Sequence, residues 1–122
     1  MFEIQVDVEK NLVSLSWHGK VEPEEARRCA EQLEIRLSEI HSGFRFLGDL
    51  TGLVSMDVAC APWIRRVMDL CNQRGIGMVV RVIPDPKKDI GLAIMSLFHY
   101  DRGVRIITCK SLQEAVRVLS ES

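Results

Sequence analysis

The feature that most constrains the fold is a short, almost continuous apolar run at residues 76–83, Ile-Gly-Met-Val-Val-Arg-Val-Ile. A strand with one face in water alternates apolar and polar side chains, whereas a parallel strand covered on both faces does not. The run therefore predicts a parallel strand that is covered on both faces. A chain built around such a strand belongs to the α/β class.

The N-terminal segment has a different pattern, in which apolar and polar residues alternate strictly. A two-residue polar break at residues 10–11 separates two alternating runs, which is typical of a β-hairpin. We therefore expect two antiparallel strands with one buried face, the second of them ending at Gly19. The apolar positions are Phe2, Ile4, Val6, Val8, Val13, Leu15 and Trp17.

Helical patterns fill the segments between the remaining strands. Pro23 suits the first turn of a helix, and apolar residues then recur at spacings of three and four. We expect further strands at 44–50 and 104–109, and further helices ending before Gly75, running from about 86 to 98, and beginning after a capping box at Ser111. The residues expected to point inward are Ala26, Ala30, Leu33, Leu37 and Ile40 in the first helix, and Leu112, Ala115, Val116 and Leu119 in the last.

The predicted order is β-β-α-β-α-β-α-β-α, forming a single domain of residues 1–122. Strand–helix–strand units of this length require parallel pairing with right-handed crossovers. We therefore expect a mixed sheet with an antiparallel leading hairpin and with helices packed against it.

This order of elements and several local motifs resemble the sulfate-transporter and anti-sigma-factor-antagonist domain, called STAS. The matching residues are Gly48-Asp49-Leu50 at the end of the third strand, Ser55-Met56-Asp57 before the second helix, Gly75, and Glu114-Ala115. The resemblance implies a STAS-like fold and a regulatory module that binds a protein partner, either an anti-sigma factor or a kinase-like regulator. We expect the contact residues in the loop and helix start after the third strand, at Thr51, Ser55, Asp57, Val58, Ala59, Cys60 and Trp63.

The chain departs from this family at the phosphorylation site. The best-known members carry Asp-Ser-Ser-Gly or a similar sequence at the helix start, where the charge of a phosphorylated hydroxyl controls docking. Here Asp57 is followed by Val-Ala-Cys, so the resemblance implies a module without that switch. Pro62 would remove a hydrogen bond from a helix that began at Asp57, and we expect an irregular or late helix start between these two residues.

The sequence offers no residue set with catalytic or metal-binding spacing. Neither a histidine nor a second carboxylate is placed beside Asp49 by its spacing, and no His-x-x-His or glycine-rich nucleotide motif occurs. We expect no enzyme activity, no metal and no cofactor. Asp57 is then either a partner contact or a helix cap, and Asp49 is expected to bind loop amides.

Two other functions stay open. An apolar run could form a pocket for an apolar ligand, or a homodimer interface, from residues that include Leu92, Met95, Phe98 and Tyr100. Cys60 lies near a helix start, where a lowered thiol pKa would suit a redox sensor. Thr51 and Ser55 are the hydroxyls that remain for modification in the predicted loop.

Composition argues against several classes of partner and location. The net charge of −1 gives no electrostatic reason to bind nucleic acid or an anionic membrane. The four cysteines form no Cys-x-x-Cys pair, and no apolar run approaches the about 20 residues that span a bilayer. We therefore expect a cytoplasmic protein with reduced thiols and no membrane anchor.

Overall fold

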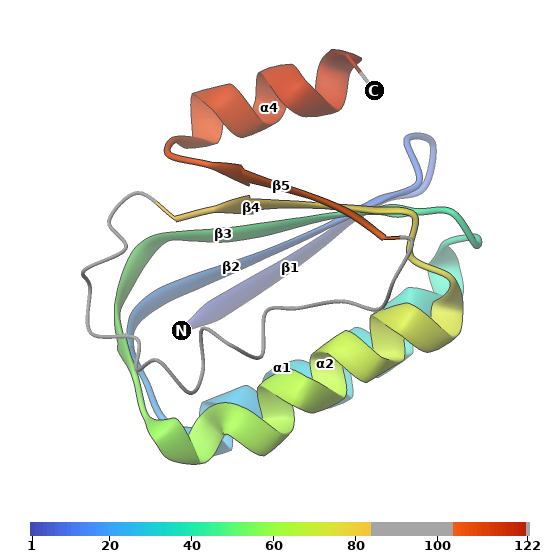
Figure 1. Cartoon of the computed structure of the whole chain (residues 1–122). Coiled ribbons are helices and arrows are strands. Elements are labelled where there is room, and N and C mark those ends of the chain that lie inside the picture. The colour runs from blue at the N-terminus through green and yellow to red at the C-terminus, as the bar shows by residue number, and fades with distance from the viewer. Residues whose placement is uncertain (84–103, 122) are drawn as a thin grey trace.

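The computed structural model describes residues 1–83 and 104–121, which form a five-stranded sheet in the order β1-β2-β3-β4-β5 (Figure 1). The first two strands are antiparallel and every later neighbour is parallel. This arrangement confirms the α/β fold with a mixed sheet and a leading hairpin. The strands are β1 (Phe2–Asp7), β2 (Leu12–Val21), β3 (Arg45–Met56), β4 (Met78–Val82) and β5 (Arg105–Cys109).

Helices cover both faces of the sheet. Helices α1 (Pro23–Arg36) and α2 (Ala61–Arg74) lie on one face, and α4 (Leu112–Glu121) lies on the other (Figure 1). None of the described helices is long and apolar enough to span a bilayer. The helix predicted at about 86–98 lies outside the described residues.

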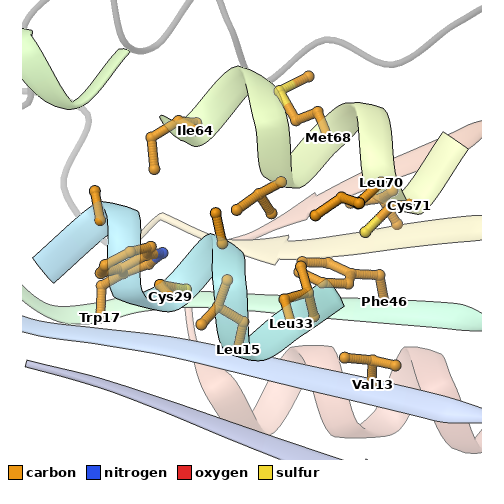
Figure 2. Packing of buried hydrophobic residues seen from close by; sticks show 14 of the residues in the cluster. Val13, Leu15, Trp17, Cys29, Leu33, Phe46, Ile64, Met68, Leu70 and Cys71 are labelled. Atoms are coloured by element: carbon orange, nitrogen blue, oxygen red, sulfur yellow. The ribbon is translucent and has the colours of Figure 1, made fainter. Parts of the chain in front are cut away.

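The larger of two apolar cores lies between the sheet and the α1–α2 pair. Figure 2 shows Trp17 of β2 and Phe46 of β3 on the same side of the sheet as Leu33 of α1 and Ile64 of α2. In β4, Val79 belongs to this larger core, whereas its neighbours on either side face a smaller core under α4. The strand is thus covered on both faces, as the apolar run at 76–83 predicts.

The first helix follows its predicted pattern closely. It begins at Pro23, and every residue expected to point inward is buried, with a 3-10 turn (Leu37–Glu39) extending the apolar face. Gly75 ends α2 in the left-handed conformation, with φ of 90°, which glycine adopts without steric cost. These two helix boundaries are confirmed.

The third strand is longer than predicted, because it continues past Leu50 to Met56. Ser16 pairs with Asp49 but His18 pairs with Gly52, so β3 holds an extra residue there; a second shift follows between Gly19 and Lys20. Such β-bulges bend the strand and change which side chains face the core. The three buried residues at the end of the strand are therefore spaced by three, at Leu50, Leu53 and Met56.

Two glycines accompany these bulges. Gly19 does not end β2 as predicted; it lies inside the strand with φ of 70°, and the strand continues to Val21. Gly52 lies against the ring of His18, where a Cβ atom would overlap the imidazole. The bulged end of the β2–β3 pair therefore depends on residues without side chains.

The last helix begins as predicted but buries a narrower face. Ser111 Oγ accepts a hydrogen bond from the Glu114 N–H at 3.1 Å, which is the expected cap. Ala115 and Leu119 are buried, whereas Leu112 and Val116, also expected inward, are 44% and 55% exposed. Ala115 and Leu119 are four residues apart, so they form a single narrow stripe that faces the sheet.

Candidate functional site

The start of α2 is built around Asp57, which follows the end of β3. Its backbone is extended, and its Oδ1 accepts a hydrogen bond from the Ala59 N–H at 2.8 Å. A 3-10 turn, η2 (Val58–Cys60), follows, and α2 begins at Ala61 with Pro62 in its first turn. The irregular, late start that Pro62 predicts is confirmed, and Asp57 acts as a helix cap.

The bulged strand and the 3-10 turn together create an exposed surface. Val54 and Val58 lie here with 54% and 58% of their side chains exposed. Thr51, Asp57 and Ala59 are also exposed. We call this set, Thr51, Val54, Asp57, Val58 and Ala59, the β3–η2 surface.

Val54 is absent from the contact residues expected from the sequence. It follows Leu53 directly, and two adjacent apolar residues do not reveal which of them faces the solvent. The register shift between Ser16 and His18 decides this, because it pairs Leu53 with Gly19 and leaves Leu53 inward and Val54 outward. No local sequence pattern marks that bulge.

Three expected contact residues lie less openly. Ser55 is half-buried, and Trp63 is half-buried against the larger core. Cys60 has no exposed surface, and its Sγ lies 3.6 Å from the Val21 carbonyl oxygen. Its side chain therefore supports the turn from inside and is not part of the surface.

The environment of Cys60 also bears on the redox hypothesis. Burial raises the pKa of its thiol to about 11, and the nearby carboxylates of Asp57 and Glu22 act in the same direction. A redox sensor needs a lowered pKa because the thiolate is the reactive form. The burial of Cys60 and the raised pKa of its thiol therefore argue against the redox alternative, since desolvation outweighs any effect of the helix start.

Asp49 binds local groups, as expected for a strand-end carboxylate. Its Oδ1 accepts hydrogen bonds from the Thr51 N–H at 2.9 Å and from Thr51 Oγ1 at 2.5 Å. The sheet register also places Ser16 beside Asp49, and His18 Nε2 lies 3.3 Å from Ser16 Oγ. No sequence pattern marks this cluster, because only the register of β2 against β3 brings its residues together. The two pairs use different partners, so they do not form a relay of serine, histidine and aspartate.

An apolar cavity lies between α2 and the sheet. Its volume is about 30 Å³, which exceeds the roughly 10–15 Å³ that a cavity needs to hold one water molecule. The residues predicted to bind an apolar ligand, Leu92, Met95, Phe98 and Tyr100, lie outside the described residues. The ligand hypothesis therefore stays a prediction. The lining residues of the cavity include Leu15, Trp17, Phe46, Ile64 and Met68.

Comparison with known proteins rests on structure alone, because no protein-family model and no curated protein matches the chain. The anti-sigma factor antagonist SpoIIAA in its unphosphorylated form matches with a TM-score of 0.62 and 9% identity, over 100% of this chain and 99% of that one. A protein with a SpoIIAA-like fold from Shewanella loihica matches with a TM-score of 0.65 and 14% identity, over 97% and 93%. An anti-sigma factor antagonist from Mycobacterium paratuberculosis matches with a TM-score of 0.57 and 12% identity, over 98% and 95%. The chain therefore has the SpoIIAA-like fold, the fold of the STAS domain.

Proposed function

We propose that this protein is a non-catalytic regulatory module that binds a protein partner through the β3–η2 surface. The observation that carries the proposal is the pair of exposed valines, Val54 and Val58, held on either side of the Asp57 cap. Exposed apolar side chains that gather in one patch mark protein–protein interaction sites, which supports the proposal. The fold supports a partner of the anti-sigma factor or kinase-like class, since two of the similar structures are anti-sigma factor antagonists.

We further propose that this surface works without a phosphorylation switch. Val58 and Ala59 carry no hydroxyl, and they occupy the exposed turn at the helix start. The Thr51 hydroxyl is hydrogen-bonded to Asp49, and Ser55 is half-buried. Without a phosphorylatable hydroxyl the charge of this surface stays constant, so the module would stay competent to bind its partner.

The proposal is tested by retention of proteins from an extract of the native cell. Wild-type protein, Val58→Asp and a matched control, Val116→Asp, are immobilised, and the retained proteins are identified by mass spectrometry. Val116 is exposed to a similar degree, 55% against 58%, but lies on α4 across the sheet.

We expect one or more proteins to be retained by the wild type and by Val116→Asp but not by Val58→Asp. Circular dichroism checks that both variants are folded. Equal retention by all three proteins would exclude the β3–η2 surface as the binding site.

A further inference from the structure

We propose that the binding surface continues along the outer face of α2 and that the partner segment seated there is acidic. This inference rests on the proposed function and names the chemistry of the partner. It arises from the spacing of exposed residues, from a hollow on α2 and from an arginine that has no partner among the described residues.

Five exposed residues of η2 and α2 form one stripe. Steps of four, three and four join Val58 to Pro62, Arg65 and Asp69, which places them on one helical face, and Arg66 lies next to Arg65 at its edge. The stripe begins on the β3–η2 surface, so the two surfaces are continuous. We call it the α2 stripe; it consists of Val58, Pro62, Arg65, Arg66 and Asp69.

The α2 stripe is hollowed in its middle. An open hollow of about 330 Å³ is lined by four of its residues together with Ala61. Its lining combines apolar surface, at Ala61 and Pro62, with the side chains of Arg65 and Arg66. A side chain from a partner can therefore contact apolar surface and a guanidinium at the same place.

The two arginines differ in what they bind. Arg66 forms an ion pair with Glu34 of α1 at 3.1 Å. Within residues 1–83 and 104–121, the exposed guanidinium of Arg65 has no hydrogen-bond or ion-pair partner. Its N–H donors are therefore available to a carboxylate, which guanidinium groups bind in a bidentate geometry.

The order of apolar and charged residues along the α2 stripe defines which partner segment is complementary to it. Apolar side chains come first at Val58 and Pro62, the available cation follows at Arg65, and Asp69 ends the stripe with a negative charge. A complementary segment carries apolar residues over the first pair and a carboxylate over Arg65. Because Asp69 repels a second carboxylate, the segment has its acidic group near the middle.

A polyanion fits this surface poorly. Nucleic acid binding draws on several cations that contact successive phosphates. The α2 stripe offers one available guanidinium, and its other arginine is neutralised by Glu34 while Asp69 lies beside them. The charge pattern therefore favours a protein segment with a single carboxylate.

Two synthetic amphipathic helical peptides test the proposal. Both peptides carry the same leucine stripe, and they differ only in having glutamate or lysine beside it. These flanking positions contact the surface on which an amphipathic helix lies, so they test its charge preference. Fluorescence anisotropy measures the affinity of the full chain for each peptide as wild type, Arg65→Glu, Val58→Asp and Arg117→Glu. Arg117 is an exposed arginine on α4, across the sheet, and serves as the matched control.

We expect the glutamate peptide to bind the wild type more tightly than the lysine peptide does, and more weakly as salt rises. Arg65→Glu should weaken the glutamate peptide by about five- to tenfold, as expected for reversing one exposed charge pair, while Arg117→Glu leaves it unchanged. Equal binding of both peptides, or no effect of Arg65→Glu, overturns the inference.

The variants separate the two proposals. Weaker binding in Val58→Asp with no change in Arg65→Glu retains the β3–η2 surface as the binding site but rejects the acidic partner. No change in either variant counts against both proposals. Equal weakening by Arg65→Glu and Arg117→Glu would indicate a nonspecific charge effect and would also reject the acidic partner.

Discussion

The bulges at the end of β3 reverse which of two adjacent residues is buried, and this reversal can be tested by mutation. In a strand with regular alternation that buries Leu50 and Met56, Val54 would face the core and Leu53 the solvent. The structure has the opposite arrangement, with Leu53 fully buried and Val54 54% exposed. Truncating each residue to alanine therefore tests the bulges directly.

The expected costs differ severalfold. Leu53→Ala removes a fully buried side chain from the larger core, for which the free energy of unfolding falls by about 3 kcal/mol. For a chain of this size, this lowers the melting temperature by roughly 10 °C. Val54→Ala removes an exposed side chain and should change the free energy of unfolding by less than about 0.5 kcal/mol.

Urea unfolding measures both values in the same experiment. Trp17 is buried in the larger core and Trp63 packs against it, so the fluorescence of the two tryptophans together reports loss of that core. The denaturant dependence should be alike in the wild type and both variants, which permits comparison of the midpoints. If Val54→Ala costs as much as Leu53→Ala, the bulged register is wrong.

Two further predictions concern the helix start and the buried thiols. Asp57→Ala removes the bond to the Ala59 N–H and should cost about 1 kcal/mol of unfolding free energy, whereas Asp57→Asn should retain most of it; thermal unfolding of both variants decides. Burial raises the pKa values of Cys29 and Cys71 to about 12, so the folded protein holds these protons at a pH where the unfolded chain, with a thiol pKa near 9.0, releases them. The free energy of unfolding should therefore be unaffected below pH 9.0 and fall as the pH rises from there towards 12. The fall should be less steep in Cys29→Ala, measured by urea unfolding across this pH range. An equally steep fall in that variant would contradict a raised pKa at Cys29.

The parts of the fold that could be predicted are those where one local pattern decides the outcome. The apolar run at 76–83 has no polar face, so only a strand covered on both sides accommodates it. The first helix has Pro23 at its start and a five-turn apolar stripe, and both signals agree. At such positions the chain needs no information from distant segments.

The end of β3 could not be predicted for the opposite reason. Its bulges come from pairing with β2, where Gly19 and His18 meet residues far along the chain. They convert a period of two into a spacing of three, and the sequence pattern then resembles a loop. The narrow buried face of α4 has a similar origin, because the sheet decides how much of Val116 is covered.

The candidate site was predicted in part, by the residues that act locally. The cap at Asp57 and the effect of Pro62 follow from helix chemistry alone. The inward position of Cys60, the outward position of Val54 and the proximity of Ser16 to Asp49 all depend on tertiary contacts. Propensity and spacing carry no information about such contacts.

The interleaving of buried and exposed residues explains how the proposed binding surface is held in position. Leu53, Met56 and Cys60 are buried, and they hold the intervening Val54 and Val58 outward on fixed backbone. The position of the surface therefore depends on the core and on the Asp57 cap, and not on the side chain at position 58. A substitution such as Val58→Asp alters the chemistry that a partner meets while leaving the frame in place, so its effects on binding and on stability can be measured separately.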